Sequence, residues 1–157
     1  MLFLLFSLAH DRYAIDVGQI AEVLPLVHIR PVLQAPPGVA GLFTYRGVPV
    51  PVVDLSELML GRAAPARLST RLILVHHPDG RGSTRLLGLI AEHATDTIRR
   101  DTADFIPSGI GQEHAVCAGP VINDEHGVIQ WLDVKTLLPA SLRDVLFKDA
   151  GRPDVAG

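Results

Sequence analysis

Short apolar runs, separated by glycine, proline and charged residues, recur along the whole chain. Runs of this length that are rich in valine, isoleucine and leucine are typical of β-strands. We predict strands over residues 3–9, 13–16, 41–45, 48–54, 71–77, 85–92, 93–100, 116–122 and 127–133, with residues 17–24 forming one helical turn that leads into another strand. Many short strands with glycine and proline turns favour β-barrels over an α/β sheet.

The helices that the pattern predicts are short. Residues 56–60 form one, with Ser56 near its N-cap, and residues 134–139 and 141–147 form two more near the end of the chain. Four prolines between residues 25 and 37 exclude a long helix there. Residues 61–69 and 101–115 are predicted as loops.

Two pairs of segments repeat. QIAEV at residues 19–23 matches LIAEH at 89–93, and residues 47–60 match 127–138 with a gap of two residues. Both members of the second pair contain Gly-Val, an apolar strand, an aspartate and a short leucine-bearing helix. A duplication of this kind predicts two similar small β-subdomains.

The most strand-like segment, residues 48–54, contains two prolines. Pro49 and Pro51 are two residues apart, so both remove a hydrogen-bond donor from the same side of the strand. We therefore predict an edge or barrel-rim strand. Its two faces are both apolar, with Val52 on one and Val53 on the other. Such a strand either packs under another subdomain or meets a partner.

Composition narrows the class of protein. The chain has 157 residues, 48% of them hydrophobic, which is enough for one compact domain or for two small half-domains that share a core. A net charge of −3 gives no basic footprint for nucleic acid. The apolar N-terminus has no preceding cation and is too short to span a bilayer, so we predict a buried first strand. Cys117 is the one cysteine. A single cysteine excludes an internal disulfide and a cysteine-based zinc site, and it favours a reducing cytosol. We predict that Cys117 is a buried, inert thiol.

Candidate catalytic and metal-binding groups are few. His76 and His77 are adjacent on a predicted strand, so their side chains point to opposite faces and cannot readily share a metal. Glu92 and His93 diverge for the same reason. No metalloprotease, nucleophile-elbow or phosphate-loop motif occurs in the sequence. We predict no catalytic residue, metal or cofactor. A small β-barrel enzyme or ligand-binding domain that uses His76, His77 or Glu92 is the alternative.

Arg46 and Gly47 lie at the predicted turn before the proline-containing strand. Gly47 permits a backbone conformation that other residues resist. The turn would present Arg46, with its five donors, at a rim. A solvated turn arginine is the alternative interpretation.

An ordered set of residues carries a resemblance across nearly the whole chain. The set is Phe6, Leu8, Tyr13, Ile15, Ile20, Glu22, Pro36–Pro37, Gly41, Arg46, Gly47, Pro51, Asp54 and Leu55, followed by LLGLIAEHATDTI at 86–98 and LDVKTLL at 132–138. In this order it resembles the CheW family of chemotaxis coupling proteins. Thr44 and Tyr45 stand where the family has asparagine and leucine, and Glu92 stands where it has aspartate. Residues 86–97 and 127–133 look most like the adaptors of Wsp-type surface-sensing pathways.

The resemblance implies an all-β fold with short helices, in which two five-stranded SH3-like β-barrel subdomains pack around a shared hydrophobic core. It implies one domain over residues 1–148, with intertwined subdomains at about 14–69 and 70–132 plus terminal elements. Residues 149–157 are expected to form a disordered tail.

The resemblance also implies a function. Family members are non-catalytic, cytoplasmic adaptors, recruited to membrane-associated arrays, that join the regulatory domain of a CheA-type histidine kinase to the cytoplasmic hairpin tip of a chemoreceptor. By position, the receptor would contact Val17, Ile20, Glu22, Arg46 and Gly47, and the kinase would contact Pro37, Val39 and Leu60. The free protein is expected to be a monomer. A regulatory domain detached from a kinase, with the same fold, is the alternative within this family.

Overall fold

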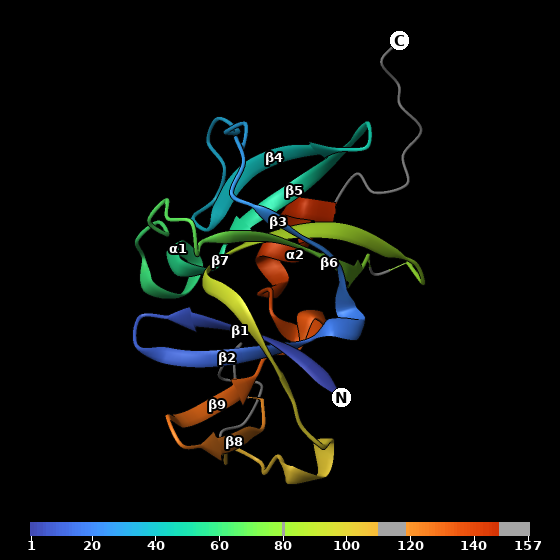
Figure 1. The fold of residues 1–157 in the computed structure, drawn as a ribbon. Helices are drawn as coiled ribbons and strands as arrows, with labels where there is room; N and C mark the ends of the chain where they lie inside the picture. Colours follow the sequence, from blue (N-terminus) through green and yellow to red (C-terminus); the bar gives the residue numbers. More distant parts are fainter. Residues whose placement is uncertain (80, 110–118, 148–157) are drawn as a thin grey trace.

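The computed structural model describes residues 1–79, 81–109 and 119–147, and its strands form one continuous sheet that curls into two units (Figure 1). The strands are β1 (Leu2–Leu8), β2 (Asp11–Asp16), β3 (Ile20–Pro25), β4 (Val39–Tyr45), β5 (Val48–Asp54), β6 (Arg71–Pro78), β7 (Thr84–Arg99), β8 (Val121–Asp124) and β9 (Gly127–Trp131). The helices are α1 (Leu55–Leu60) and α2 (Ala140–Phe147), with 3-10 turns η1 (Val17–Gln19), η2 (Thr102–Asp104) and η3 (Val134–Thr136). None of the described helices has the length and apolar character needed to cross a membrane.

The strand β7 belongs to both units. Residues 85–92 and 93–100, predicted as two strands, are one strand of 16 residues. Its first half, 84–91, pairs with β5 and β6, and its second half, 92–99, pairs with β1. His93 has a φ of 53° and lies within a register shift against β1. Because a bulge bends a strand, β7 leaves one unit and enters the other at this point.

Each unit contains five strands. We call one the β5 barrel, which comprises β3, β4, β5, β6 and the first half of β7. The other is the β9 barrel, which comprises β1, β2, β8, β9 and the second half of β7. An isolated bridge closes each one, Arg30 to Leu42 in the β5 barrel and Ile106 to Val121 in the β9 barrel. The prediction of two five-stranded SH3-like subdomains is confirmed.

The barrels do not follow two halves of the sequence. The predicted division into 14–69 and 70–132 assigns β6 to the second subdomain, but β6 pairs with β3 and with the first half of β7. The chain leaves the β5 barrel only at the bulge in β7. The division therefore lies near residue 92. The tail predicted at 149–157 and Cys117 lie outside the described residues.

The strand pairing confirms the predicted repeat. β5 is antiparallel to β4 and parallel to the first half of β7, while β9 is antiparallel to β8 and parallel to β2. An aspartate then caps a short helix in each barrel. Asp54 accepts hydrogen bonds from the N–H groups of Ser56 and Glu57, and Asp133 accepts one from Lys135. Ser56 lies near the N-cap, as predicted, but the capping residue is Asp54 and α1 begins one residue before Ser56, at Leu55.

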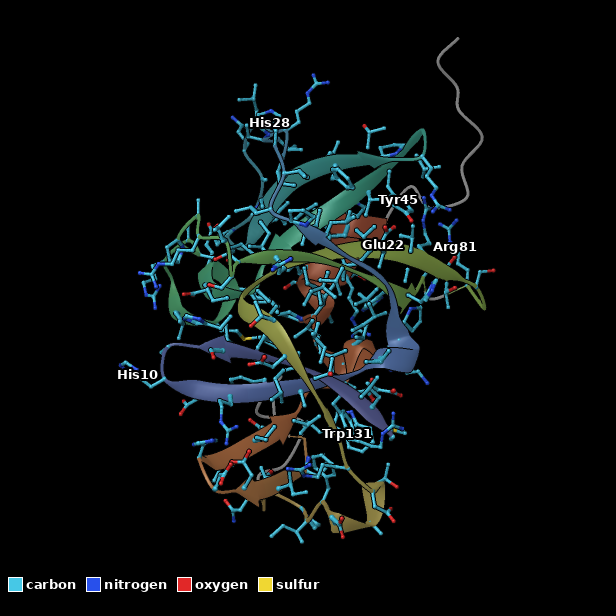
Figure 2. All side chains as sticks on the ribbon, in the orientation of Figure 1. His10, Glu22, His28, Tyr45, Arg81 and Trp131 are labelled. Carbon is cyan, nitrogen blue, oxygen red and sulfur yellow. The ribbon has the colours of Figure 1, made fainter. Side chains whose placement is uncertain are left out.

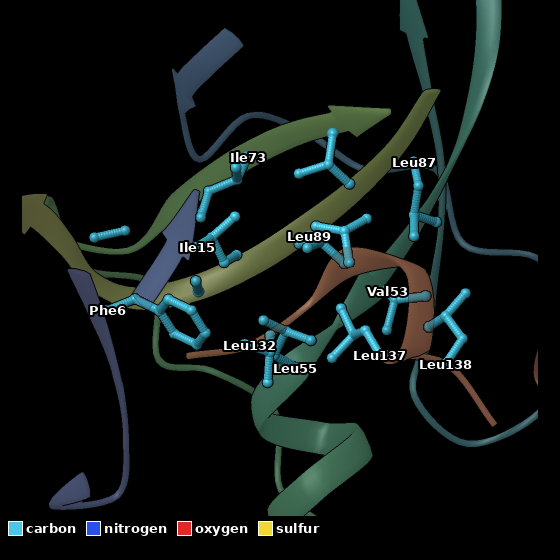
Figure 3. Packing of buried hydrophobic residues seen from close by; sticks show 14 of the residues in the cluster. Phe6, Ile15, Val53, Leu55, Ile73, Leu87, Leu89, Leu132, Leu137 and Leu138 are labelled. Carbon is cyan, nitrogen blue, oxygen red and sulfur yellow. The ribbon is translucent and has the colours of Figure 1, made fainter. Parts of the chain in front are cut away.

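A shared core joins the two barrels (Figure 3). It combines Phe6 and Ile15 of the β9 barrel with Val53 and Leu89 of the β5 barrel, all of them nearly or fully buried. The α1 residue Ser56 is also buried there, and its hydroxyl donates a hydrogen bond to the carboxylate of Glu92 at the start of the second half of β7. This contact ties the helix of one barrel to the crossover strand of both.

The two apolar faces of β5 now have an explanation. Val50 and Val52 point into the core of the β5 barrel, whereas Val53 points into the shared core. Packing against another subdomain, one of the two predicted alternatives, is therefore confirmed for Val53.

Candidate docking surface

The turn between β4 and β5 presents Arg46 at the rim of the β5 barrel. Tyr45 pairs with Val48, which leaves a two-residue loop. Arg46 and Gly47 have φ values of 50° and 81°. Positive φ at both positions is the geometry of a hairpin turn whose twist matches that of its strands. A Cβ on Gly47 would meet nothing within 4 Å, so the backbone conformation, and not a lack of space, favours glycine there.

Tyr45 connects the two charged residues that the resemblance assigned to the receptor. Its hydroxyl donates a hydrogen bond to the Glu22 carboxylate, and Figure 2 shows the two residues close together. The Tyr45 ring lies 5.0 Å from the Arg46 guanidinium carbon. The hydrogen bond to Glu22 is the main reason that the pKa of Tyr45 is raised above its ordinary value. Because a neutral phenol can donate to a carboxylate and a phenolate cannot, this contact favours the protonated ring. We call Glu22, Tyr45 and Arg46 the rim triad.

A groove of about 360 Å³ lies beside the rim triad. It is lined by Tyr45, Arg46, Val48, Pro49, Val50, Pro51, Thr84, Arg85 and Leu86. The groove lies where β5 and β7 separate, because the two strands pair only from Val52 to Asp54. The prediction of an unpaired edge at Pro49 and Pro51 is confirmed.

Two further predicted receptor residues, Val17 and Ile20, are not on this rim. Both are half-buried and pack against the shared core. Gly47 adjoins Arg46 in the turn. The structure therefore brings Glu22, Arg46 and Gly47 together, and it places Val17 and Ile20 at the other end of the short segment that leads into Glu22. The assignment of these five residues to a receptor stays a prediction.

The residues predicted to contact a kinase lie at the opposite end of β5. Pro37 is exposed, Val39 is half-buried against the shared core, and Leu60 is 40% exposed at the end of α1. A Cβ on Gly38 would lie 2.9 Å from Cδ1 of Leu58, so the segment 37–39 packs closely on α1. The seven residues of β5 rise about 3.3 Å each, which separates this end from Arg46 by roughly 20 Å.

The sequence did not identify Tyr45 or Arg85 as site residues. Tyr45 departs from the family pattern, and that departure is a usable signal. Arg85 gave none, because it is 39 positions beyond Arg46 and reaches the groove only through the pairing of β5 with β7.

The candidate catalytic groups lie apart. His76 is exposed and His77 is buried, as expected for neighbours on a strand. Burial is the main reason that the pKa of His77 is lowered. Glu92 is buried and His93 is exposed. Among the described residues, no group of three or more His, Cys, Asp or Glu side chains could hold a metal ion.

Comparisons with known proteins agree on one family. The CheW-like domain matches residues 2–141. A chemotaxis protein CheW from Bacillus subtilis is 23% identical over 137 residues, which is 86% of this chain and 85% of that protein. The chemotaxis protein CheW from Klebsiella aerogenes is 23% identical over 106 residues, which is 68% of this chain and 61% of that protein.

A solved structure supports the fold. The scaffolding protein TtCheW from Thermoanaerobacter tengcongensis superimposes with a TM-score of 0.75 and 21% identity, covering 90% of this chain and 89% of that one. The narrower likeness to Wsp-type adaptors stays a prediction. The family match extends over both barrels, from β1 to the start of α2. The chain therefore belongs to the CheW-like domain family.

Proposed function

We propose that this protein is a non-catalytic adaptor that couples a chemoreceptor to a CheA-type histidine kinase in bacterial chemosensory signalling. The match of the CheW-like domain to residues 2–141 carries the proposal, and two similar proteins, each 23% identical to this chain, are chemotaxis CheW proteins. The adaptor would act in the cytoplasm and be recruited to receptor arrays at the membrane.

The two partners would use opposite ends of β5. The receptor's hairpin tip would meet the rim triad and Gly47, with Val17 and Ile20 supporting the strand that carries Glu22. Opposite charges at Glu22 and Arg46 would fix the register of a helical tip, because charge complementarity selects partners and orientation. The kinase regulatory domain would meet Pro37, Val39 and Leu60 beside α1. A separation of roughly 20 Å would let one adaptor hold both partners at once.

Calorimetric titration tests the proposal. The probes are the regulatory domain of a CheA-type kinase and the cytoplasmic fragment of a chemoreceptor, both from the source organism. Native protein should bind each one saturably. Arg46→Ala should weaken receptor binding about tenfold and leave kinase binding unchanged. Arg99→Ala, which removes an exposed arginine at the far end of β7, is the matched control and should alter neither.

Failure has a clear form. If the native protein binds neither probe at about 100 μM, which is well into the weak range, the adaptor function is wrong. If it binds kinase and receptor but Arg46→Ala changes nothing, the adaptor function stands and Arg46 is a solvated turn residue. A chain that binds a second CheW-like domain but no receptor would be the detached kinase regulatory domain.

A further inference from the structure

We infer that the groove beside β5 receives an aliphatic segment of the receptor tip that carries a carboxylate, and that Arg85 joins Arg46 in binding that carboxylate. The inference rests on the proposed function and names the chemistry of the partner at that surface. It also adds Arg85, which the resemblance did not assign to any partner.

The groove exists because a parallel ladder stops early. β5 and β7 pair at three positions, from Val52 opposite Gly88 to Asp54 opposite Ile90. The same register, continued, would place Val50 opposite Leu86 and Pro49 opposite Arg85. Those residues line the groove instead. Pro49 and Pro51 have no N–H, so the ladder cannot continue along β5.

The same prolines decide how a partner can bind. The N–H and C=O groups of one strand residue point to the same side, and at Pro49 and Pro51 only the carbonyl is present. A partner strand added to this edge of β5 would find acceptors without donors. Recognition must therefore come from side chains, and Val48, Pro51 and Leu86 are among the apolar residues that line the groove.

The mouth of the groove is cationic. Two arginines and no acidic residue are among its lining residues. Neither Arg46 nor Arg85 forms an ion pair with any other residue in the described part of the chain. Arg46 is stacked on Tyr45, and Arg85 is exposed on β7. A guanidinium offers paired donors that fit a carboxylate. Two guanidinium groups beside the apolar lining of the groove would therefore select an acidic, aliphatic segment.

In the β9 barrel, the chain itself provides a carboxylate for an arginine at the corresponding junction. There, Arg12 of β2 reaches across to the β8–β9 hairpin and binds both carboxylate oxygens of Asp124. It also donates to the carbonyl of Gly127. In the β9 barrel, an arginine–carboxylate pair within the chain therefore occupies the gap beside the hairpin. In the β5 barrel the chain supplies the arginines, and the carboxylate comes from outside.

The test compares charge reversals in the full-length protein. Arg85→Glu and Arg99→Glu each reverse the charge of one exposed arginine, at opposite ends of β7. Both variants should keep the native melting curve. The probe is the purified receptor cytoplasmic fragment, with the kinase regulatory domain as a second probe. Arg85→Glu should weaken receptor binding at least 20-fold, whereas Arg99→Glu should change it less than twofold. Kinase binding should be unchanged in both. Native affinity should fall as salt rises, and the fall should be shallower in Arg85→Ala.

The outcomes separate the two proposals. Loss of receptor binding in Arg85→Glu alone supports both. If Arg85→Glu binds within twofold of the native protein while Arg46→Ala is weakened, the inference about the groove is wrong and the adaptor function stands. Equal weakening by Arg85→Glu and Arg99→Glu would show general charge attraction and would also overturn it. If the native protein binds no receptor, the adaptor function fails and the inference fails with it.

Discussion

In the β9 barrel, β9 pairs with β2 from Ile129 onward, whereas in the β5 barrel β5 pairs with β7 only from Val52 onward. Ile129 lies four residues before its capping aspartate, Asp133, and Val50 lies four residues before Asp54. The parallel ladder of the β5 barrel therefore begins two residues later than that of the β9 barrel. Each copy pairs three residues on each strand, but the ladder of the β5 barrel is displaced by two residues toward its aspartate.

The side chains at the junction explain the difference. Counted from the same aspartates, Gln130 of the β9 barrel corresponds to Pro51 of the β5 barrel. Gln130 can donate its N–H to the neighbouring strand, and a proline cannot. At the position that corresponds to Leu86, the β9 barrel has Arg12, which pairs with Asp124. One barrel closes the gap with a ladder and an ion pair, and the other leaves a groove.

This comparison shows how one copy of a duplicated fold can carry a groove without a change of architecture. At this gap the two copies differ by two prolines in one and an arginine–aspartate pair in the other. The same strands, caps and core packing remain in both copies. The groove is therefore a local feature of the β5 barrel, and substitutions at the junction should alter it without unfolding the domain.

The largest loss of stability is expected from a substitution in the buried core, which both barrels have. Val52 is fully buried, so Val52→Asp would bury a carboxylate without a partner, which costs several kcal/mol. That loss is comparable to the total stability of a domain of this size. We expect an unfolded or insoluble protein by circular dichroism. Val48→Asp, on the same strand but 52% exposed, should melt as the native protein does. A native melting curve for Val52→Asp would contradict the strand assignment.

The next effect concerns the ion pair that closes the β9 barrel. Arg12 and Asp124 side chains are 22% and 14% exposed, so Arg12→Ala leaves a mostly buried carboxylate without its main partner. We expect a loss of about 1–3 kcal/mol in the free energy of unfolding, measured in urea. Arg85→Ala beside the open groove should cost less than about 0.5 kcal/mol. Equal losses would mean that the two junctions do not differ as described.

Acid should weaken the same ion pair. The hydrogen bond from Arg12 is the main cause that lowers the pKa of Asp124 from 3.8 to about 2. Because the folded pKa lies below the unfolded one, the stabilisation is complete above about pH 4 and is lost as the pH falls through about 2. The difference in unfolding free energy between the native protein and Asp124→Asn should therefore shrink as the pH falls over this range. A difference that stays constant down to pH 2 would show that the carboxylate is not held by Arg12.

Much of this architecture could be predicted from local sequence. The short apolar runs gave the strands, and the matched segments 47–60 and 127–138 indicated two similar subdomains. Local pattern could not assign strands to barrels, because the strands of one barrel are far apart in the sequence. In the β5 barrel, β3 pairs with β6, and β5 pairs with the first half of β7. Local pattern also missed that the bulge at His93 lets one strand serve both barrels.

The docking surface was predicted in part, for the same reason. The turn at Arg46 and Gly47 and the edge at Pro49 are local features, and the sequence revealed them. The bond from Tyr45 to Glu22 joins residues 23 positions apart, and the pair of Arg12 with Asp124 spans 112. Only the folded chain brings such residues together.

Closing the groove is a smaller but more specific change. The double variant Pro49→Val/Pro51→Val restores two N–H groups toward β7, where the ladder can continue. Its stability should stay within about 1 kcal/mol of native, because the new hydrogen bonds offset the greater freedom of the unfolded chain. Receptor affinity should fall about tenfold. Pro107→Val, an exposed proline after the second half of β7, is the control. A double variant that binds as tightly as the native protein would show that the partner does not enter the groove.

The smallest effect is a change in one titration within the rim triad. The chain has two tyrosines, and the bond to Glu22 raises the pKa of Tyr45. Glu22→Gln removes the carboxylate charge, so the pKa of Tyr45 should fall toward its ordinary value. Ultraviolet absorbance of tyrosinate between pH 9 and about 12 follows this titration, and Tyr45→Phe identifies the signal of Tyr45. The stabilising bond is present below the ordinary pKa and is lost as the pH rises through the raised one. Unchanged titration in Glu22→Gln would mean that the phenol is not bound to Glu22 in solution. The rim triad would then not be preformed, and receptor binding at Arg46 would have to order it first.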